Sequence, residues 1–356
     1  MFKEIILHIG MHKTATTSIQ GFCGEHANKL QNKFDTFYPT FSNPSRSKIF
    51  NHSIPFYSIF SNEPEKYSIN INQGINTKEL AEESNKIFKK QFRNRVEKTN
   101  ASRLLISGED ISRLNHIEMT RMKNFLSKFL EEDGKFTVIL FLRNPISYCQ
   151  SALQQRVKSG LGSIDHCLQN FLNSSGTLYD TRLEPAKRVF GKENIKIVDF
   201  DVAKTIEFGP VEAFFNCIDI KIPKVLLKAQ NIKNESISNE SLHLISEINK
   251  LEPRFIDKNP NPIREKMDLQ RFFSIKGTKY ELPQEKQTLL MEESKKTIRK
   301  LKNIYNFDFQ DTNLKETKSI PFNQDTLKEI KSIIDNHQDK TSQEKMLEAY
   351  NNIVSA

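Results

Sequence analysis

The chain has 356 residues, of which 37% are hydrophobic, 27% are charged and 26 are Phe. This composition excludes a largely disordered chain, because the Phe side chains supply large apolar groups for a core. Lys and Arg total 53 and Asp and Glu total 44, giving a formal charge of +9. That balance favours anionic partners, although it would also serve solubility alone. No basic tail stands out, so the charge gives no reason to expect nucleic-acid binding.

The cysteines and the N-terminus indicate the compartment. Four cysteines lack CxxC pairs and metal-ligand spacing: Cys23, Cys149, Cys167 and Cys217. We expect free buried thiols, which suit a reducing cytoplasm. The stretch MFKEIILHIG lacks the features of a signal peptide. No run of about 18 apolar residues occurs, so we expect no transmembrane segment and a soluble cytoplasmic protein.

Strand and helix patterns alternate along the first 200 residues. Four short, nearly continuous apolar segments are typical of strands covered on both faces: residues 4–10, 103–108, 136–142 and 195–200. Helical spacing is clearest over residues 16–30, 78–98, 117–129, 145–158 and 178–189. This alternation predicts an α/β fold with a central parallel sheet flanked by helices.

The remaining segments are less regular. Residues 34–76 are rich in Phe, Tyr, Ser, Asn and Pro, and such a segment is either a lid or substrate wall or a surface excursion without function. Amphipathic helices are predicted over residues 239–251 and 285–306, and two more follow the polar stretch after residue 309. We therefore expect one domain over residues 1–310 and a C-terminal helical extension over residues 311–356.

The segment HIGMHKTATTSIQ, residues 8–20, joins the first predicted strand to the first predicted helix. The N-terminus of a helix binds anions, because its unpaired N–H groups and aligned dipoles amount to about half a positive charge. A P-loop of the form GxxxxGK[ST] would have its lysine at position 16, which is a threonine here. Lys13 stands three residues earlier, where it would lie beside a short anionic group rather than along a triphosphate.

These residues resemble the 5′-phosphosulfate loop of sulfotransferases, which use 3′-phosphoadenosine-5′-phosphosulfate as the sulfo donor. The loop of that family reads approximately [P/H]-K-[ST]-G-T-T, and residues 12–17 here read HKTATT. The resemblance implies a P-loop NTPase-like three-layer architecture. It also implies a donor site formed by Lys13, Thr14, Ala15, Thr16, Thr17 and Ser18. Ala15 replaces the usual glycine, and alanine tolerates a positive φ poorly, so we expect a slightly reshaped loop.

A second segment, FTVILFLRNPISYCQSALQQRVKSG, matches another hallmark of the same family. A predicted strand ends at Arg143, and Ser151 follows eight residues later. Asn144 is a good N-cap and Pro145 a good first helical residue. Arginine grips phosphate through bidentate, charge-assisted hydrogen bonds, and serine adds a hydroxyl. By resemblance, Arg143 and Ser151 bind the 3′-phosphate of the donor.

Sulfuryl transfer depends mainly on positioning and electrostatics, by analogy with phosphoryl transfer. We expect Lys13 to stabilise the leaving oxygen and the sulfonate, so no metal is required. Glu109, at the end of the second predicted strand, is the first candidate for the general base. Alternatively, Glu109 or Asp110 caps the next helix. His12 is a second candidate base and His52 would bind the acceptor, although a lone histidine is usually structural.

The sequence thus predicts an enzyme that transfers a sulfo group in line from 3′-phosphoadenosine-5′-phosphosulfate to a hydroxyl of a saccharide or glycolipid. The nucleotide product would be adenosine 3′,5′-bisphosphate. The runner-up is a P-loop kinase or NTPase with a degenerate loop, in which Asp201 would bind Mg²⁺. A third interpretation is a non-catalytic binding module that assembles through its C-terminal helices.

Overall fold

The computed structural model describes residues 1–42, 47–228, 236–257, 259–310, 314 and 321–355. The chain divides into two compact units, each built from three separate segments. Unit 1 comprises Met1–Asn144, Thr177–Ile232 and Thr297–Asp311. Unit 2 comprises Pro145–Gly176, Lys233–Lys296 and Thr312–Ala356. Each unit is described below by itself.

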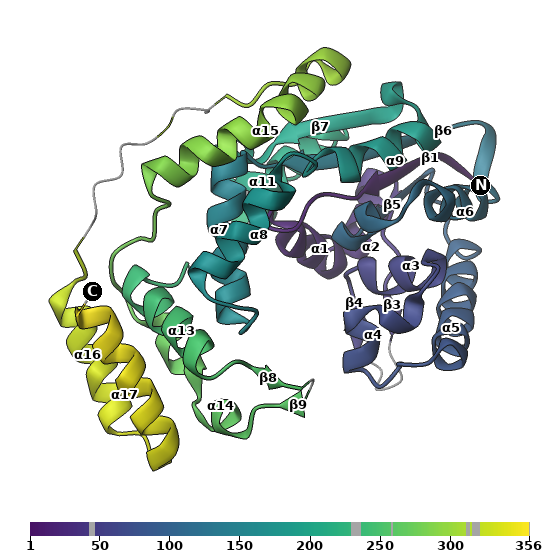
Figure 1. Cartoon of the computed structure of the whole chain (residues 1–356). Helices are drawn as coiled ribbons and strands as arrows, with labels where there is room; N and C mark the ends of the chain where they lie inside the picture. Colours follow the sequence, from purple (N-terminus) through teal and green to yellow (C-terminus); the bar gives the residue numbers. More distant parts are fainter. Residues whose placement is uncertain (43–46, 229–235, 258, 311–313, 315–320, 356) are drawn as a thin grey trace. The chain divides into compact units, whose positions relative to one another are not determined.

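Among the described residues, a five-stranded parallel sheet forms the centre of unit 1, in the order β2-β5-β1-β6-β7 (Figure 1). Its strands are β1 (Phe2–His8), β2 (Thr36–Phe37), β5 (Arg103–Ser107), β6 (Leu130–Leu142) and β7 (Ile195–Asp199). In the centre, Ile6 of β1 is aligned with Leu105 of β5 and with Thr137 of β6. The four predicted strands are confirmed. The edge strand β2 was not predicted, because two residues are too few to show a hydrophobic pattern.

Helices cover both faces of this sheet. The covering helices include α1 (Thr16–Glu25), α6 (His116–Ser127), α9 (Asp180–Phe190) and α11 (Gly209–Cys217). Ile6, Ile139 and Phe141 pack in one cluster with residues of α1 and α11. Because successive side chains of a strand point to opposite faces, Val138 and Leu140 lie on the other side, where α6 and α9 contact β6. The predicted three-layer α/β architecture, a central parallel sheet flanked by helices, is confirmed. Its similarity to P-loop NTPases stays a prediction.

The single helix predicted over residues 16–30 is two helices, α1 and α2 (Ala27–Phe34), separated by His26. Glycine favours helices poorly, and Gly24 stands in the last turn of α1. The ring of Phe50 packs so closely on Gly24 that a Cβ there would lie 2.2 Å from it. A glycine and a tertiary contact therefore end the helix where the apolar spacing alone would continue it.

The segment predicted to be irregular, residues 34–76, packs tightly in the parts that the structure describes, which exclude residues 43–46. Its elements after β2 are β3 (Phe41–Ser42), β4 (Lys48–Ile49), α3 (Ser53–Phe60), a 3₁₀ turn (Pro64–Lys66) and α4 (Ser68–Asn72). Phe41 meets Phe88 and Phe92 of α5 (Lys78–Val96), with ring centroids 5.9 and 6.4 Å apart. The segment is thus anchored by aromatic packing, and its role as a lid or substrate wall stays a prediction.

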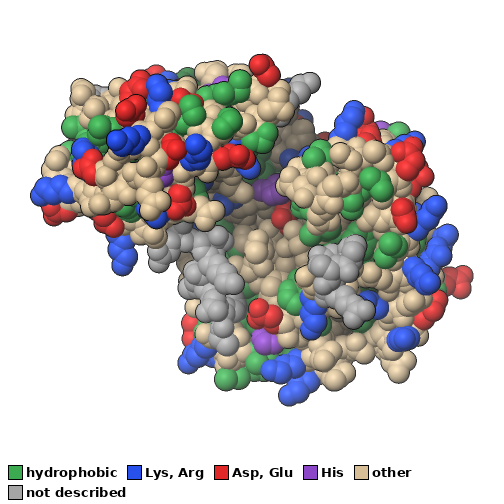
Figure 2. Space-filling view, turned by 90° about the horizontal axis from the view of Figure 1, so that it is seen from below, with side chains coloured by type: hydrophobic (Ala, Val, Ile, Leu, Met, Phe, Trp, Pro, Cys, Tyr) green, Lys and Arg blue, Asp and Glu red, His purple; other side chains and the backbone are tan. Residues whose placement is uncertain are grey.

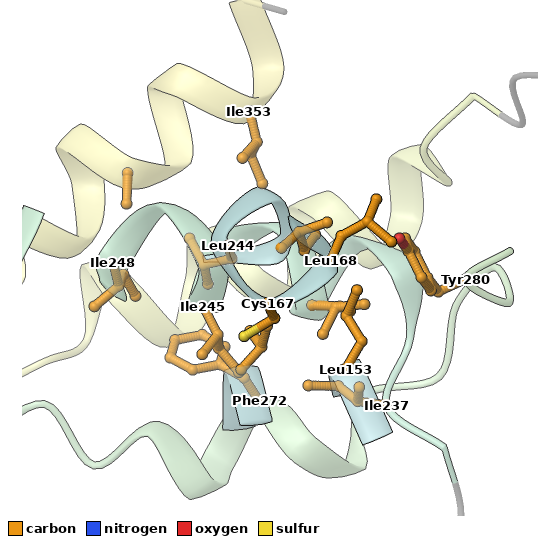
Figure 3. Close-up of a cluster of buried hydrophobic side chains, with 14 of the residues drawn as sticks. Leu153, Cys167, Leu168, Ile237, Leu244, Ile245, Ile248, Phe272, Tyr280 and Ile353 are labelled. Carbon is orange, nitrogen blue, oxygen red and sulfur yellow. The ribbon is translucent and has the colours of Figure 1, made fainter. Parts of the chain in front are cut away.

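Unit 2 is mainly helical, and its core joins segments far apart in the sequence (Figure 3). Its longer helices include α7 (Pro145–Lys158), α8 (Ile164–Ser175), α13 (Asn239–Leu251), α16 (Gln324–Asp335) and α17 (Lys340–Ser355). Leu153, Cys167, Leu244, Ile245 and Ile353 share one apolar cluster. The C-terminal helices therefore pack within unit 2, and the boundary expected at residue 310 does not coincide with a separate compact unit. A division into independently folding domains at that residue stays a prediction.

The other described elements are short, apart from α15. They are α10 (Phe200–Ala203), α12 (Lys224–Lys228), β8 (Phe255–Ile256), β9 (Asn259–Pro260), α14 (Pro262–Lys266), α15 (Gln284–Tyr305) and 3₁₀ turns at Glu109–Arg113, Lys192–Asn194 and Leu269–Ser274. Of the helices that the structure describes, none is both long enough and apolar enough to cross a lipid bilayer.

Two fully buried histidines make unit 1 sensitive to mild acid. Burial lowers the pKa of His8 and of His52 from the ordinary 6.5 to about 3. The ring of His52 bonds to the Pro39 carbonyl through Nε2 and accepts the Ser107 N–H at Nδ1. A second proton on this ring would point at that N–H group, so the folded state excludes it.

We expect the free energy of unfolding to fall by about 1.4 kcal/mol per pH unit for each of these histidines as the pH drops below 6.5. In this pH range the unfolded state binds protons at these rings and the folded state does not. The loss of stability therefore grows until the pH reaches about 3. At pH 5 the two rings together should lower the free energy of unfolding by about 4 kcal/mol. Urea unfolding at pH 7 and pH 5 measures this difference. His52→Gln should remove about half of it and His166→Gln, on the surface of α8, none; equal stability at both pH values would contradict the account.

Candidate anion-binding and catalytic site

Three segments leave the sheet of unit 1 at the carboxyl ends of neighbouring strands. Residues 9–15 follow β1, residues 108–113 follow β5 and residues 143–144 follow β6. In the strand order, β5 and β6 lie on opposite sides of β1, so the chain connections diverge at β1. Open parallel sheets bind their ligands at such a switch point. The lysine-bearing loop therefore occupies the usual ligand position of this kind of sheet.

The loop after β1 is a compact and strained turn. The Ile9 N–H donates to the Ile139 carbonyl at 3.0 Å, and the Thr14 hydroxyl donates to the Met11 carbonyl at 2.6 Å. Lys13 and Ala15 are both in the left-handed region, with φ of 67° and 56°. This conformation costs a residue with a Cβ about 1–2 kcal/mol. The strain that the sequence suggests at Ala15 is present, and Lys13 adds a second strained position.

His8 lies beneath the loop. Its ring contacts Phe141 and Phe214, with centroids 5.6 and 5.0 Å apart, and its Nδ1 is 2.8 Å from Ser107 Oγ. Its Nε2 is buried close to Gly10, and no described residue forms a hydrogen bond with it. A Cβ at position 10 would come within 3.0 Å of this nitrogen. Glycine thus lets the loop cross directly over the His8 ring.

Helix α1 begins at Thr16, and no described side chain caps its N-terminus. Its first N–H groups and its dipole are therefore open to an anion. Of the hydroxyls predicted to bind the donor, those of Thr14 and Thr16 belong to buried residues, whereas Thr17 is exposed and Ser18 half-buried. We therefore expect Thr14 and Thr16 to act through their backbone N–H groups, and Thr17 and Ser18 also through side chains.

Arg143 joins the end of β6 to the loop. Its Nη1 donates to the Lys13 carbonyl at 3.1 Å, and its Nε lies 3.7 Å from Asp201 Oδ1. The guanidinium carbon lies 5.1 Å from the centroid of the Phe200 ring. The Tyr179 hydroxyl donates to the Arg143 carbonyl at 2.7 Å, which fixes the backbone as well. Unit 1 therefore brings the cationic strand end and the lysine-bearing loop together.

Ser151 lies on α7 of unit 2, so its predicted pairing with Arg143 on one phosphate stays a prediction. Asp201, the Mg²⁺ ligand of the kinase alternative, has other partners. It forms a 2.6 Å ion pair with Lys204 and accepts the Asn144 N–H at 3.0 Å. A carboxylate engaged by these groups and by Arg143 is poorly placed to coordinate a metal, which weighs against the kinase alternative.

Glu109 is buried behind the loop, with 9% of its surface exposed. Its Oε2 accepts a hydrogen bond from Gln20 Nε2 at 2.7 Å and lies 3.4 Å from Ser53 Oγ. Its Oε1 lies 3.5 Å from Asn51 Nδ2. These three partners were not predicted from the sequence. Gln20 alone carries a recognisable pattern, because it is a polar residue on the buried side of α1.

Asp110, the next residue, has a separate set of partners. It accepts hydrogen bonds from His12 Nε2 at 2.9 Å, from the Tyr67 hydroxyl at 2.7 Å and from Arg113 at 3.1 Å. Burial alone would raise the pKa of Asp110, but these donors outweigh it and lower the pKa to about 2. The carboxyl group is therefore an anion at neutral pH.

The alternative that Asp110 or Glu109 caps the next helix is wrong. Asn115 caps α6, accepting the N–H of Glu118, and the Glu118 side chain accepts the N–H of Asn115 in return. Glu109 and Asp110 belong to the 3₁₀ turn over Glu109–Arg113, which precedes this cap. Neither carboxylate is therefore the N-cap of α6.

His52 is fully buried, and its two ring nitrogens bond to Pro39 and Ser107. The ring also stacks on Tyr38, with centroids 4.3 Å apart. These contacts tie the segment over residues 34–76 to the end of β5. The role of His52 in acceptor binding stays a prediction. In this structure both of its ring nitrogens are engaged in hydrogen bonds.

The net positive charge is distributed rather than gathered into one stripe on the face that Figure 2 shows, where basic and acidic side chains are interspersed. For binding an anion, the positive charge close to the loop therefore matters more than the net charge of the chain. At the loop, positive charge comes from Lys13, from Arg143 and from the N-terminus of α1.

No protein-family model matches the chain, and no curated protein matches it significantly. Among solved structures, one match is a sulfotransferase from Alicyclobacillus acidocaldarius. The TM-score is 0.38 and the sequence identity 13%, and the match covers 62% of this chain and 87% of that chain. A likeness this distant carries no argument about activity. The parallel sheet and its covering helices define the fold class of the chain.

We expect Ala15→Gly to stabilise the protein, because glycine adopts the left-handed conformation without strain. The relief of about 1–2 kcal/mol is partly offset by the greater freedom of glycine in the unfolded chain. A net gain of about 0.5–1 kcal/mol should appear in urea unfolding. Ala81→Gly, within helix α5, is the control and should instead cost about 1–2 kcal/mol, because a buried methyl group is lost as well as helix propensity. A loss of stability in both variants would show that position 15 is unstrained.

Proposed function

We propose that the protein is a sulfotransferase that moves a sulfo group from 3′-phosphoadenosine-5′-phosphosulfate to a hydroxyl of a saccharide or glycolipid. The observation that carries this proposal is the hydrogen bond between Arg143 and the Lys13 carbonyl. It joins a lysine-bearing anion loop to a cationic strand end at the switch point of the sheet. The donor carries anionic groups at both its 5′ and 3′ positions, and two neighbouring cationic positions suit such a molecule.

The loop supplies what the transferring end of the donor requires. The N–H groups at the start of α1 would bind the 5′-phosphate, together with the hydroxyls of Thr17 and Ser18. Lys13 stands on the loop before the helix, so its ammonium group would lie beside the bridging oxygen and the sulfonate. By the resemblance, Arg143 and Ser151 take the 3′-phosphate, and the acceptor is a saccharide or glycolipid.

The reaction is an in-line displacement at sulfur. The acceptor oxygen forms a bond to sulfur while the bond from sulfur to the 5′-phosphate oxygen breaks. The electron pair of that bond leaves with adenosine 3′,5′-bisphosphate, and Lys13 stabilises the developing negative charge. The proton of the acceptor hydroxyl passes to a general base, for which Glu109 and His12 are the candidates. This chemistry requires no metal, and the cytoplasmic location expected from the free cysteines is part of the same proposal.

Ligand binding separates this proposal from the kinase alternative. Adenosine 3′,5′-bisphosphate should stabilise the protein against heat, by about 2.7 kcal/mol at a hundred times its dissociation constant. ATP with Mg²⁺ should stabilise it far less, because position 16 carries no lysine for the terminal phosphates. A thermal-shift titration with both ligands measures the difference. Stabilisation by ATP with Mg²⁺ alone would instead favour the kinase alternative.

Two substitutions test the assigned roles of the cationic residues. Lys13→Ala should lower kcat by about 10²–10³-fold, as the loss of one oxyanion-stabilising donor does. Arg143→Ala should mainly raise KM for the donor and weaken binding of the bisphosphate. Transfer of labelled sulfo group to a panel of saccharides measures both effects. Lys29→Ala, at an exposed position of α2, is the control and should change neither. Unchanged transfer in both test variants would refute the assignment.

A further inference from the structure

Two adjacent carboxylates follow β5, and their surroundings give them different roles. Glu109 is engaged with Gln20, Ser53 and Asn51, all inside unit 1. Asp110 accepts a hydrogen bond from His12, whose side chain is 44% exposed, whereas that of Asp110 is only 6% exposed. The histidine therefore extends from a buried carboxylate toward solvent. A group that takes a proton from an acceptor must reach that acceptor, and His12 meets this condition better than Glu109 does.

The contact with Asp110 also sets the tautomer of His12. Its Nε2 lies 2.9 Å from the Asp110 carboxylate, which can only accept a hydrogen bond, so Nε2 carries the proton. In the neutral ring, Nδ1 is then unprotonated and able to accept a proton. Within the part of the chain that the structure describes, no hydrogen bond engages Nδ1.

Asp110 is itself held in place. The Tyr67 hydroxyl and Arg113 both donate to its carboxylate, and its backbone N–H donates to Ser53 Oγ at 3.0 Å. Two of these bonds hold the carboxylate and the third holds the backbone of the same residue, so Asp110 can orient the imidazole of His12. The low pKa of Asp110, about 2, agrees with a carboxylate that stays ionised at neutral pH.

We propose that His12 is the general base for the acceptor hydroxyl and that Asp110 is the positioning residue that orients it. This inference rests on the proposed sulfo transfer and decides between its two candidate bases. His12 immediately precedes Lys13, so the base and the ammonium group stand on adjacent residues of one loop, with Cα atoms about 3.8 Å apart. The acceptor proton moves to Nδ1 as the oxygen–sulfur bond forms, and Lys13 meets the charge on the departing 5′-phosphate oxygen.

In this arrangement Glu109 does not touch the reacting atoms. Its bond to Gln20, the fifth residue of α1, ties the helix that follows the anion loop to the end of β5. The Ser53 hydroxyl links the two residues, because its oxygen accepts the Asp110 backbone N–H and lies 3.4 Å from Glu109 Oε2. Glu109 thus braces α1, and its loss should affect stability and donor binding more than proton transfer.

Chemical rescue tests the role of His12. His12→Gly should lower kcat by about 10²–10⁴-fold, with the donor KM and the thermal shift with adenosine 3′,5′-bisphosphate unchanged. Added imidazole should restore much of the lost turnover, since it can occupy the space of the missing ring. The probe is labelled donor with lactose, cellobiose and N-acetyllactosamine as acceptors. His116→Gln, on α6 and outside the loop, is the control and should keep wild-type turnover.

The outcomes separate the two proposals. Retained turnover in His12→Gly, or a folded variant that imidazole does not rescue, would overturn the role of His12 and leave sulfo transfer standing. A larger kcat loss in Glu109→Gln than in His12→Gly would assign the base to Glu109 instead. If the wild type neither binds the bisphosphate nor consumes the donor, the proposed function fails, and the assignment of the base fails with it.

Nitrogen NMR of the histidine rings tests the role of Asp110 without any activity assay. At pH 8 the wild-type ring of His12 should carry its proton on Nε2, with Nδ1 in the unprotonated form. In Asp110→Asn a substantial fraction should move to the other tautomer, and kcat should fall about 10–100-fold, as it does on loss of an orienting partner. A wild-type ring protonated on Nδ1, or an unchanged tautomer in Asp110→Asn, would overturn the inference.

Discussion

The hydrogen bond from Arg143 to the Lys13 carbonyl is the contact on which the rest of the candidate site depends. It joins residues 130 apart in the sequence and acts on a backbone that is itself strained at Lys13. A hydrogen bond from a charged donor contributes about 1.5–3 kcal/mol, which is comparable to the cost of about 1–2 kcal/mol for the left-handed conformation of Lys13. The left-handed turn that sets the direction of the lysine is therefore stabilised by the same guanidinium that we assign to the other end of the donor.

The fold was predictable because its signals are local. Strands buried on both faces are apolar along their length, and their alternation with helices admits few topologies. The position of the loop followed as well, because carboxyl ends of parallel strands meet at one edge of a sheet. The positive φ of Ala15 was also expected, because the loop pattern usually has glycine at this position.

The partners within the site were not predictable, because they depend on tertiary contacts. His12 and Asp110 are 98 residues apart, and Tyr67 lies 43 residues from Asp110, in a segment without clear periodicity. From the sequence, Glu109 and Asp110 were adjacent carboxylates at one strand end, and Glu109 was the first candidate for the general base. The structure distinguishes them by their partners, since Glu109 binds Gln20 of α1 and Asp110 binds His12 of the loop. The helix cap expected from Asp110 is provided by Asn115 instead.

The interleaving of the two units has a consequence for biosynthesis. Helix α13 buries Leu244 and Ile245 in a cluster that also needs Ile353, near the end of the chain. The ribosome must therefore synthesise the chain as far as α17 before that apolar surface is covered. Until then it is exposed to solvent and to other nascent chains, which is the state most prone to aggregation. A chain ending near residue 310 would keep the sheet of unit 1 but leave this cluster open, so helices α16 and α17 cover the apolar side chains of the helices made before them.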